Sequence, residues 1–177
     1  LLTQYLVYLG NLARLDFGNS LSGDRRPVWD RIKERLPLTI SMNVASLILT
    51  LAVAIPIGVT SARRQGGLFD RAATVFVFIG FAMPGFWLAL LLMLYFGIHL
   101  GWLPISGLTS MDYARLGPWD KIVDLARHLA LPIFIYTFGS LAGMSRFMRS
   151  AMLEVLRQDY ILTARAKGLS EFTVIYK

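Results

Sequence analysis

The sequence predicts an all-α integral membrane protein, a polytopic bundle of transmembrane helices with amphipathic helices outside the membrane. Composition is the first observation: 55% of the 177 residues are hydrophobic and only 16% are charged, whereas soluble domains carry about 25% charged residues. The second is a series of three long apolar runs, and the third is the gathering of basic residues between and after these runs. Together they indicate one membrane domain.

The charge balance and the missing residue types limit the classes of function. A net charge of +7 in so apolar a chain fits Lys and Arg that face anionic lipid at the cytoplasmic ends of spans, and no nucleic-acid partner is expected. The chain has no cysteine, which excludes disulfides, thiol catalysis and Cys-ligated metals. It starts at Leu1 without a signal-peptide pattern, so we expect it to begin inside a longer protein.

Residues 1–35 are expected to lie outside the cytoplasm. Apolar residues recur at helical spacing over residues 1–15, which predicts an amphipathic helix there. A stretch rich in Gly, Asn, Ser and Asp follows at residues 18–24, Ser22 among them, and predicts turns. A second, short amphipathic stretch begins at Trp29 and leads into the membrane.

The three apolar runs predict transmembrane helices over residues 36–62, 72–97 and 129–148. The first run contains no charged residue and would form a helix of about 40 Å, longer than a hydrocarbon core of about 30 Å requires. The third run is shorter, but its helical pattern continues through Arg146 and Arg149.

Each predicted span contains an internal proline. In membrane helices the carbonyl that proline leaves free can be satisfied by neighbouring groups, so proline produces a kink rather than a break. Kinked helices are common where a pathway opens and closes, although Gly and Pro are also simply frequent in membrane helices. The candidate gating kinks are Pro56, Pro84 with Gly85, and Pro132.

The loops set the expected topology. The link at residues 63–71, RRQGGLFDR, holds three arginines in nine residues and should be cytoplasmic. Alternation of three spans then places residues 1–35 and 98–128 outside and residues 149–177 inside. The basic tail supports this orientation, whereas the basic N-terminal segment argues against it.

No pattern in the sequence indicates an enzyme. P-loop, HExxH and GxSxG motifs are missing, and the two histidines, His99 and His128, lie near predicted membrane boundaries, where interfacial polar residues are more usual than metal ligands. We therefore expect no catalytic residue, bound cofactor or metal in this chain. Polar side chains in the spans either line a path or form hydrogen bonds across helices, the latter being favoured: Thr39, Ser41, Asn43, Ser46 and Thr50.

Arg146 and Arg149 are three residues apart and share one helix face. Three roles are open to them: they reach lipid phosphates, they face a cavity, or they pair with carboxylates on helices outside this chain. Reaching phosphates or structural pairing is favoured over contact with a substrate.

The tail predicts a helix, a tight turn and a second helix. Asp159 is suited to cap a helix that starts at Tyr160, and Gly168 lies where that helix would end in the left-handed conformation. Ser170 is suited to cap the next helix. Two interpretations remain open: a docking surface for a soluble partner, or an amphipathic hairpin on the membrane surface.

The tail resembles the EAA loop of bacterial ABC importer permeases, specifically the dipeptide, oligopeptide and nickel group with its DY-x-x-TARAKGL signature. The glutamate position of the general motif is occupied by Leu162. Weaker collinear similarities cover nearly the whole chain, including Pro84 with Phe86 and the approach to the tail at Arg146. The residues that match the signature are Asp159, Tyr160, Thr163, Ala164, Arg165, Ala166, Lys167, Gly168 and Leu169.

This resemblance implies a permease of about six spans, of which the chain would hold the second to the fourth, in a bacterial plasma (inner) membrane. It implies a second, homologous permease subunit and two cytoplasmic ATPase subunits, which would hold ATP and magnesium. An extracytoplasmic solute-binding protein would deliver the solute. Residues 159–170, which end at Ser170, would form the coupling helix that docks on an ATPase subunit.

The implied function is ATP-driven import of di- or oligopeptides by alternating access, with the chain a transport subunit rather than an enzyme. Nickel or another small solute is the alternative substrate within the group. The hypotheses outside the group are a non-transporting membrane scaffold, which would not need a coupling motif, and an intramembrane enzyme, for which no nucleophile and base or metal constellation exists.

Overall fold

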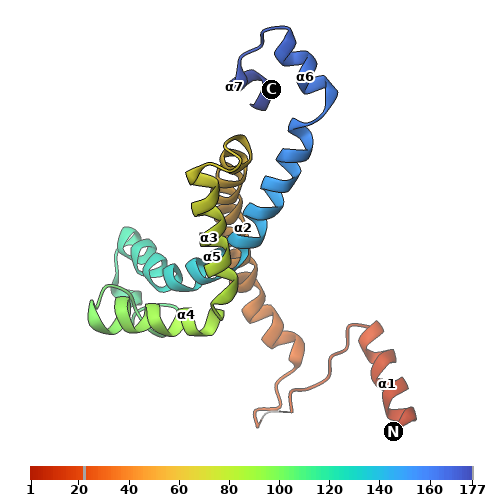
Figure 1. Ribbon diagram of the computed structural model, residues 1–177. Coiled ribbons are helices and arrows are strands. Elements are labelled where there is room, and N and C mark those ends of the chain that lie inside the picture. Colours follow the sequence, from red (N-terminus) through yellow and green to blue (C-terminus); the bar gives the residue numbers. More distant parts are fainter. Residues whose placement is uncertain (22, 177) are drawn as a thin grey trace. The chain divides into compact units, whose positions relative to one another are not determined.

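The computed structural model describes residues 1–21 and 23–176, so the predicted turn residue Ser22 and the terminal Lys177 lie outside the described residues. The described residues form helices and loops without a β-strand, in agreement with the predicted all-α class (Figure 1). The chain divides into two compact units, Leu1–Val44 and Ala45–Lys177.

The first unit contains helix α1, Leu2–Ala13, which confirms the amphipathic helix predicted for residues 1–15. A loop follows, and the first part of α2 (Val28–Arg63) completes the unit. The stretch at Trp29 is therefore continuous with the first long helix instead of forming a separate one. Arg31 donates a hydrogen bond to Asp24, which lowers the pKa of that carboxyl.

The second unit holds the remainder of α2 and all later elements. Two helices, α2 and α5, are long and apolar enough to cross a membrane. A third span results if the bent pair formed by Leu68–Ala82 and Gly85–His99 counts as one. The later elements are α3 (Leu68–Ala82), α4 (Gly85–Leu92), the π-helix η1 (Met93–His99), the 3₁₀ turn η2 (Tyr113–Arg115), α5 (Pro118–Leu156), α6 (Asp159–Ala166) and α7 (Glu171–Tyr176).

The predicted span at residues 72–97 is not one kinked helix. Helix α3 ends at Ala82, α4 begins at Gly85, and the chain bends by 96° between them; Figure 1 shows the green α4 leaving the yellow-green α3. The ring of Pro84 disfavours a helical backbone at the preceding residue, and Met83 and Pro84 have ψ angles of 119° and 130°. The hydropathy of the sequence does not reveal the break between α3 and α4, because the residues on both sides of it are apolar.

Helix α5 begins at Pro118, well before the predicted span at residues 129–148, and ends at Leu156. The extension is polar and holds the loop before it. Asp124 accepts hydrogen bonds from the backbone N–H of Ser110, at 3.0 Å, and from its hydroxyl, and Arg127 Nε donates to the carbonyl of Trp102 at 3.1 Å. These bonds satisfy side chains that an apolar run alone would not include.

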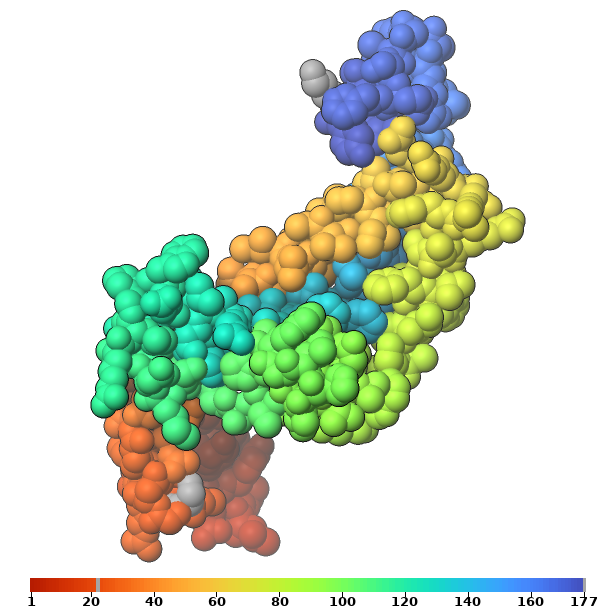
Figure 2. All heavy atoms as spheres, turned by 90° about the vertical axis from the view of Figure 1, so that its left-hand side faces the viewer, coloured from red at the N-terminus to blue at the C-terminus, as the bar shows by residue number. Residues whose placement is uncertain are grey.

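Within the second unit, the later part of α2 packs closely on α5. A Cβ atom added to Gly58 would lie 2.6 Å from Met148 Cβ, so glycine permits this approach of the two backbones. In Figure 2 the yellow-green α3 and the blue α5 lie beside this part of α2. Only 17% of the most apolar window of α2 or of α5 is buried, which leaves most of their apolar surface for lipid or other protein segments.

Candidate functional site

Helix α6 ends in a tight turn built on Gly168. Gly168 has φ +78°, the left-handed conformation that the sequence predicts. Its N–H donates to the carbonyl of Arg165 at 2.9 Å, and the N–H of Leu169 donates to the carbonyl of Ala164 at 3.3 Å. These two bonds form a Schellman motif, which satisfies carbonyls at the end of α6 and reverses the chain sharply.

Two side-chain interactions hold α7 against this turn. Ser170 caps α7, as predicted, because its Oγ accepts a hydrogen bond from the N–H of Thr173 at 3.3 Å. Arg165 in α6 pairs with Glu171 in α7, with Nε 2.8 Å from Oε1 and a second N–H donor 3.3 Å from Oε2. The pair crosses the turn and joins α6 to α7.

The prediction that Asp159 caps this helix is wrong. Asp159 is the first residue of α6, the capping position belongs to Gln158, and no side chain caps the helix by a hydrogen bond. The backbone carbonyl of Asp159 accepts a hydrogen bond from the hydroxyl of Thr163 at 3.0 Å. The carboxylate still lies in the first turn, where the helix dipole favours a negative charge.

Residues 159–170 lie together and mostly face outward. Ile161 is buried at 5% exposure and fixes the orientation of α6. Tyr160 and Leu162 are 60% and 56% exposed, and Leu169, beyond the turn, is 48% exposed. Of the ten predicted site residues only Ala164 is half-buried; the other nine are exposed: Asp159, Tyr160, Thr163, Arg165, Ala166, Lys167, Gly168, Leu169 and Ser170.

The tail is anchored on the ends of the long helices. Val59 and Ala62 of α2 form a buried cluster with Met152 of α5. Ile175 of α7 packs against this cluster, together with Leu156 and other side chains of α5. Displacement of the tail is therefore resisted by contacts with both α2 and α5.

A partly buried ion pair joins α5 to the start of α3. Arg149 Nε lies 2.6 Å from Asp70 Oδ1, and Arg149 Nη2 lies 2.8 Å from Asp70 Oδ2, a bidentate geometry. Asp70 also accepts a hydrogen bond from the N–H of Gly66 at 2.9 Å, and its side chain is 6% exposed. Arg149 therefore forms a structural ion pair. The partner expected from the sequence lies on a helix outside this chain, whereas the observed partner, Asp70, belongs to this chain. One feature of the sequence pointed to this partner: Asp70 is the sole carboxylate in RRQGGLFDR.

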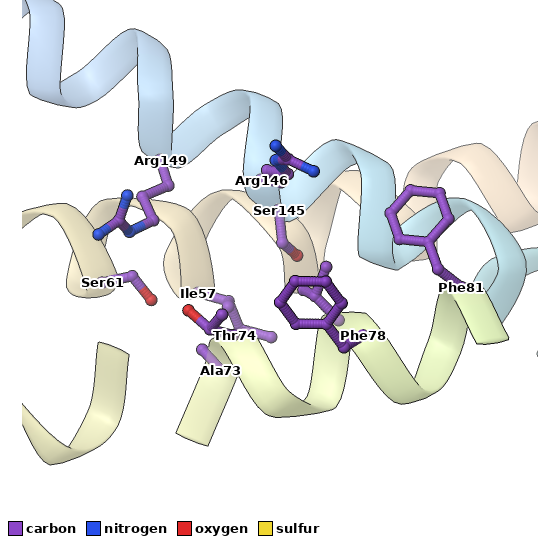
Figure 3. A pocket seen from close by; sticks show the side chains of 10 residues that line it. Ile57, Ser61, Ala73, Thr74, Phe78, Phe81, Ser145, Arg146 and Arg149 are labelled. Carbon is purple, nitrogen blue, oxygen red and sulfur yellow. The ribbon is translucent and has the colours of Figure 1, made fainter. Parts of the chain in front are cut away.

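Arg146 differs from Arg149 in having no carboxylate partner among the described residues. It lines a cavity of about 210 Å³ between α2, α3 and α5, shown in Figure 3. Across the described part of the chain, no group of three His, Asp or Glu side chains is arranged to hold a metal ion.

The candidate gating positions lie apart from the tail. Pro84 and Gly85 form the junction of α3 and α4, while α2 and α5 continue through Pro56 and Pro132. In Figure 1 the blue-green first part of α5 and its blue second part run in different directions. Pro132 lies between these parts in the sequence, where its missing N–H weakens the helix.

Comparison with known proteins shows which family the chain belongs to. Residues 54–177 match the model of the binding-protein-dependent transport system inner membrane component. The chain is 42% identical to the oligopeptide transport system permease protein AppB of Bacillus subtilis, with 98% of the chain and 54% of that protein covered. It is 37% identical to the di/tripeptide transport system permease protein DppB of Pseudomonas aeruginosa, with 98% and 55% covered.

A third relative, the dipeptide transport system permease protein DppB of Escherichia coli K12, is 35% identical, with 97% of the chain and 55% of that protein covered. The chain thus spans about half the length of the curated relatives it matches. The family match covers most of the second unit, including α3, α5 and the tail. The chain belongs to the family of inner membrane components of binding-protein-dependent transport systems.

Proposed function

We propose that the chain is part of a permease subunit of an ATP-driven importer that carries di- or oligopeptides into the cell. The observation that carries this proposal is the exposed, internally braced α6 and turn at the end of the longest helix, α5. The names of the relatives, which are oligopeptide, di/tripeptide and dipeptide permeases, support the choice of peptides. The chain itself would hold no ATP, since the nucleotide and its magnesium ion belong to partner subunits.

The connection from α6 to the membrane helices suits the transfer of motion. Only Arg157 and Gln158 separate α5 from α6, and both donate backbone hydrogen bonds to the last turn of α5, at 3.2 and 3.1 Å. The ion pair at Arg149 then ties α5 to the start of α3. A displacement of α6 by an ATPase subunit would move α5 and α3 together, with the junction at Pro84 as the hinge that alternates access.

The partners follow from this arrangement. Residues 159–170 would dock on one of two cytoplasmic ATPase subunits, and a second, homologous permease subunit would complete the pathway. The apolar surface that α2 and α5 leave uncovered suits that subunit, the rest of the permease and lipid. An extracytoplasmic solute-binding protein would meet the opposite side, where the loop before α5 is held by Asp124 and Arg127.

Cysteine cross-linking in the complete transporter tests the docking surface. The 177 residues contain no cysteine, so an introduced thiol is unique in this part of the permease. Leu162→Cys, at a side chain 56% exposed in α6, is expected to cross-link to an ATPase lysine through a short thiol-to-amine reagent. Met111→Cys, at the fully exposed Met111 of the opposite loop, is the control and should give no such product. Cross-linking of Met111→Cys but not Leu162→Cys would overturn the assignment.

A further inference from the structure

The cavity between α2, α3 and α5 combines one cation with hydroxyl groups and aromatic walls. Its lining comes from all three helices, and Figure 3 labels Ser61 of α2, Phe78 of α3 and Ser145 of α5 among the side chains that form it. The lining includes Ser61, Phe78, Phe81, Ser145 and Arg146.

The charge of this cavity is not balanced within the described chain. Arg149 also lines it, but its guanidinium is committed to Asp70. The side chain of Arg146 is exposed, and no described carboxylate lies within ion-pair distance of it. Its exposed guanidinium is therefore free to pair with an anion that enters the cavity.

Two buried hydroxyls of this cavity also lack a hydrogen-bond partner among the described residues. Ser61 is 2% exposed and Ser145 is 4% exposed, and neither Oγ has a hydrogen-bond partner among the described residues. A buried hydroxyl without a partner is destabilising, so the arrangement favours a ligand that accepts hydrogen bonds. A guanidinium with two hydroxyl donors is a donor set that matches a carboxylate.

We propose that this cavity binds the C-terminal carboxylate of the transported peptide, with Arg146 as its anchor and the hydroxyls of Ser61 and Ser145 as additional donors. The proposal rests on the peptide importer function proposed above. Peptides differ in their side chains but share this carboxylate, so one fixed cation serves many sequences. Phe78 and Phe81 add an apolar wall that accepts varied side chains without specific polar contacts.

The test is uptake by proteoliposomes that contain the complete transporter and ATP, with a labelled dipeptide supplied either as the free acid or as its C-terminal amide. Arg146→Gln is expected to lower uptake of the free acid at least tenfold and to leave uptake of the amide within twofold. Arg146→Lys should restore part of the loss. Arg115→Gln, at an exposed arginine of η2 outside the cavity, should change neither.

A second measurement does not depend on the solute-binding protein, which itself selects peptides. In an Ala73→Cys permease, whose thiol would line the cavity, the free acid should slow thiol labelling and the amide should not. Arg146→Gln should abolish that protection. If the wild-type transporter carries no amide, this thiol-labelling experiment still tests the proposal.

The outcomes separate the possible failures. The proposal would be overturned if Arg146→Gln lowered uptake of the free acid and of the amide equally, and if the free acid protected the Ala73→Cys thiol neither with Arg146 nor with Gln at that position. Those results would mean that Arg146 pairs with a carboxylate of the protein assembly. Unchanged uptake of both peptides would overturn it as well. If the wild-type transporter takes up neither peptide with ATP, the proposed function itself fails. That result differs from an Arg146→Gln variant whose ratio of acid uptake to amide uptake equals that of the wild type, which overturns only the carboxylate site.

Discussion

Replacing Arg149 by glutamine is expected to destabilise the permease by about 3–5 kcal/mol, the usual cost of removing one partner of a buried ion pair. Asp70 would remain 6% exposed with its bidentate partner removed and only the N–H of Gly66 to compensate it. Because the Arg149 side chain is 30% exposed, water partly screens the pair, and the lower end of this range is expected. The measurement is the denaturation midpoint of the full-length permease within its purified complex.

Two further variants make this prediction specific. Asp70→Asn combined with Arg149→Gln should be less destabilised than the sum of the single variants, because neither charge is then left alone. Arg146→Gln, three residues away on the same helix, removes a cation that has no described partner and should shift the midpoint far less. Equal shifts for Arg146→Gln and Arg149→Gln, or additive effects in the double variant, would contradict a structural role for the pair.

Replacing Gly168 by valine is expected to uncouple ATP hydrolysis from transport, with peptide uptake lowered at least tenfold and ATPase activity changed less than twofold. Gly168 has φ +78°, and a left-handed backbone costs an ordinary residue about 1–2 kcal/mol, more for a β-branched one. No atom lies within 4 Å of the position that its Cβ would take, so the effect arises from backbone conformation and not from crowding. The strain would open the turn and change the position of α7 relative to α6.

Asparagine is the matched control for that substitution. Gly168→Asn adds a side chain of similar size, but asparagine adopts the left-handed conformation far more readily than valine does. It should therefore retain most of the uptake. If Gly168→Val transports as well as the wild-type protein, or if both substitutions abolish uptake equally, the geometry of this turn is not what couples the ATPase to the membrane helices.

Local patterns predicted the tail well because its geometry is set by neighbouring residues. Gly168 and Ser170 act through bonds that reach only a few positions along the chain, and residue type largely determines them. The position of Asp159 was off by one residue because the helix starts there without a side-chain cap. Helix ends commonly shift by that amount.

Long-range features were beyond what the sequence could show. Asp70 and Arg149 are 79 positions apart, and no periodicity relates a loop carboxylate to one of two neighbouring arginines. The bend at Pro84 lies inside an unbroken apolar run, so its position could be inferred from the proline but its size of 96° could not. The cavity at Arg146 depends on how three helices pack.

ATP-dependent uptake of a labelled peptide mixture tests the proposed importer most directly. Proteoliposomes would contain the full-length permease, its partner permease, the ATPase subunits and the solute-binding protein, and matched vesicles would lack either ATP or this permease. We expect uptake that disappears in both matched preparations. Uptake that persists without this permease, or a permease with which no ATPase subunit associates, would contradict it.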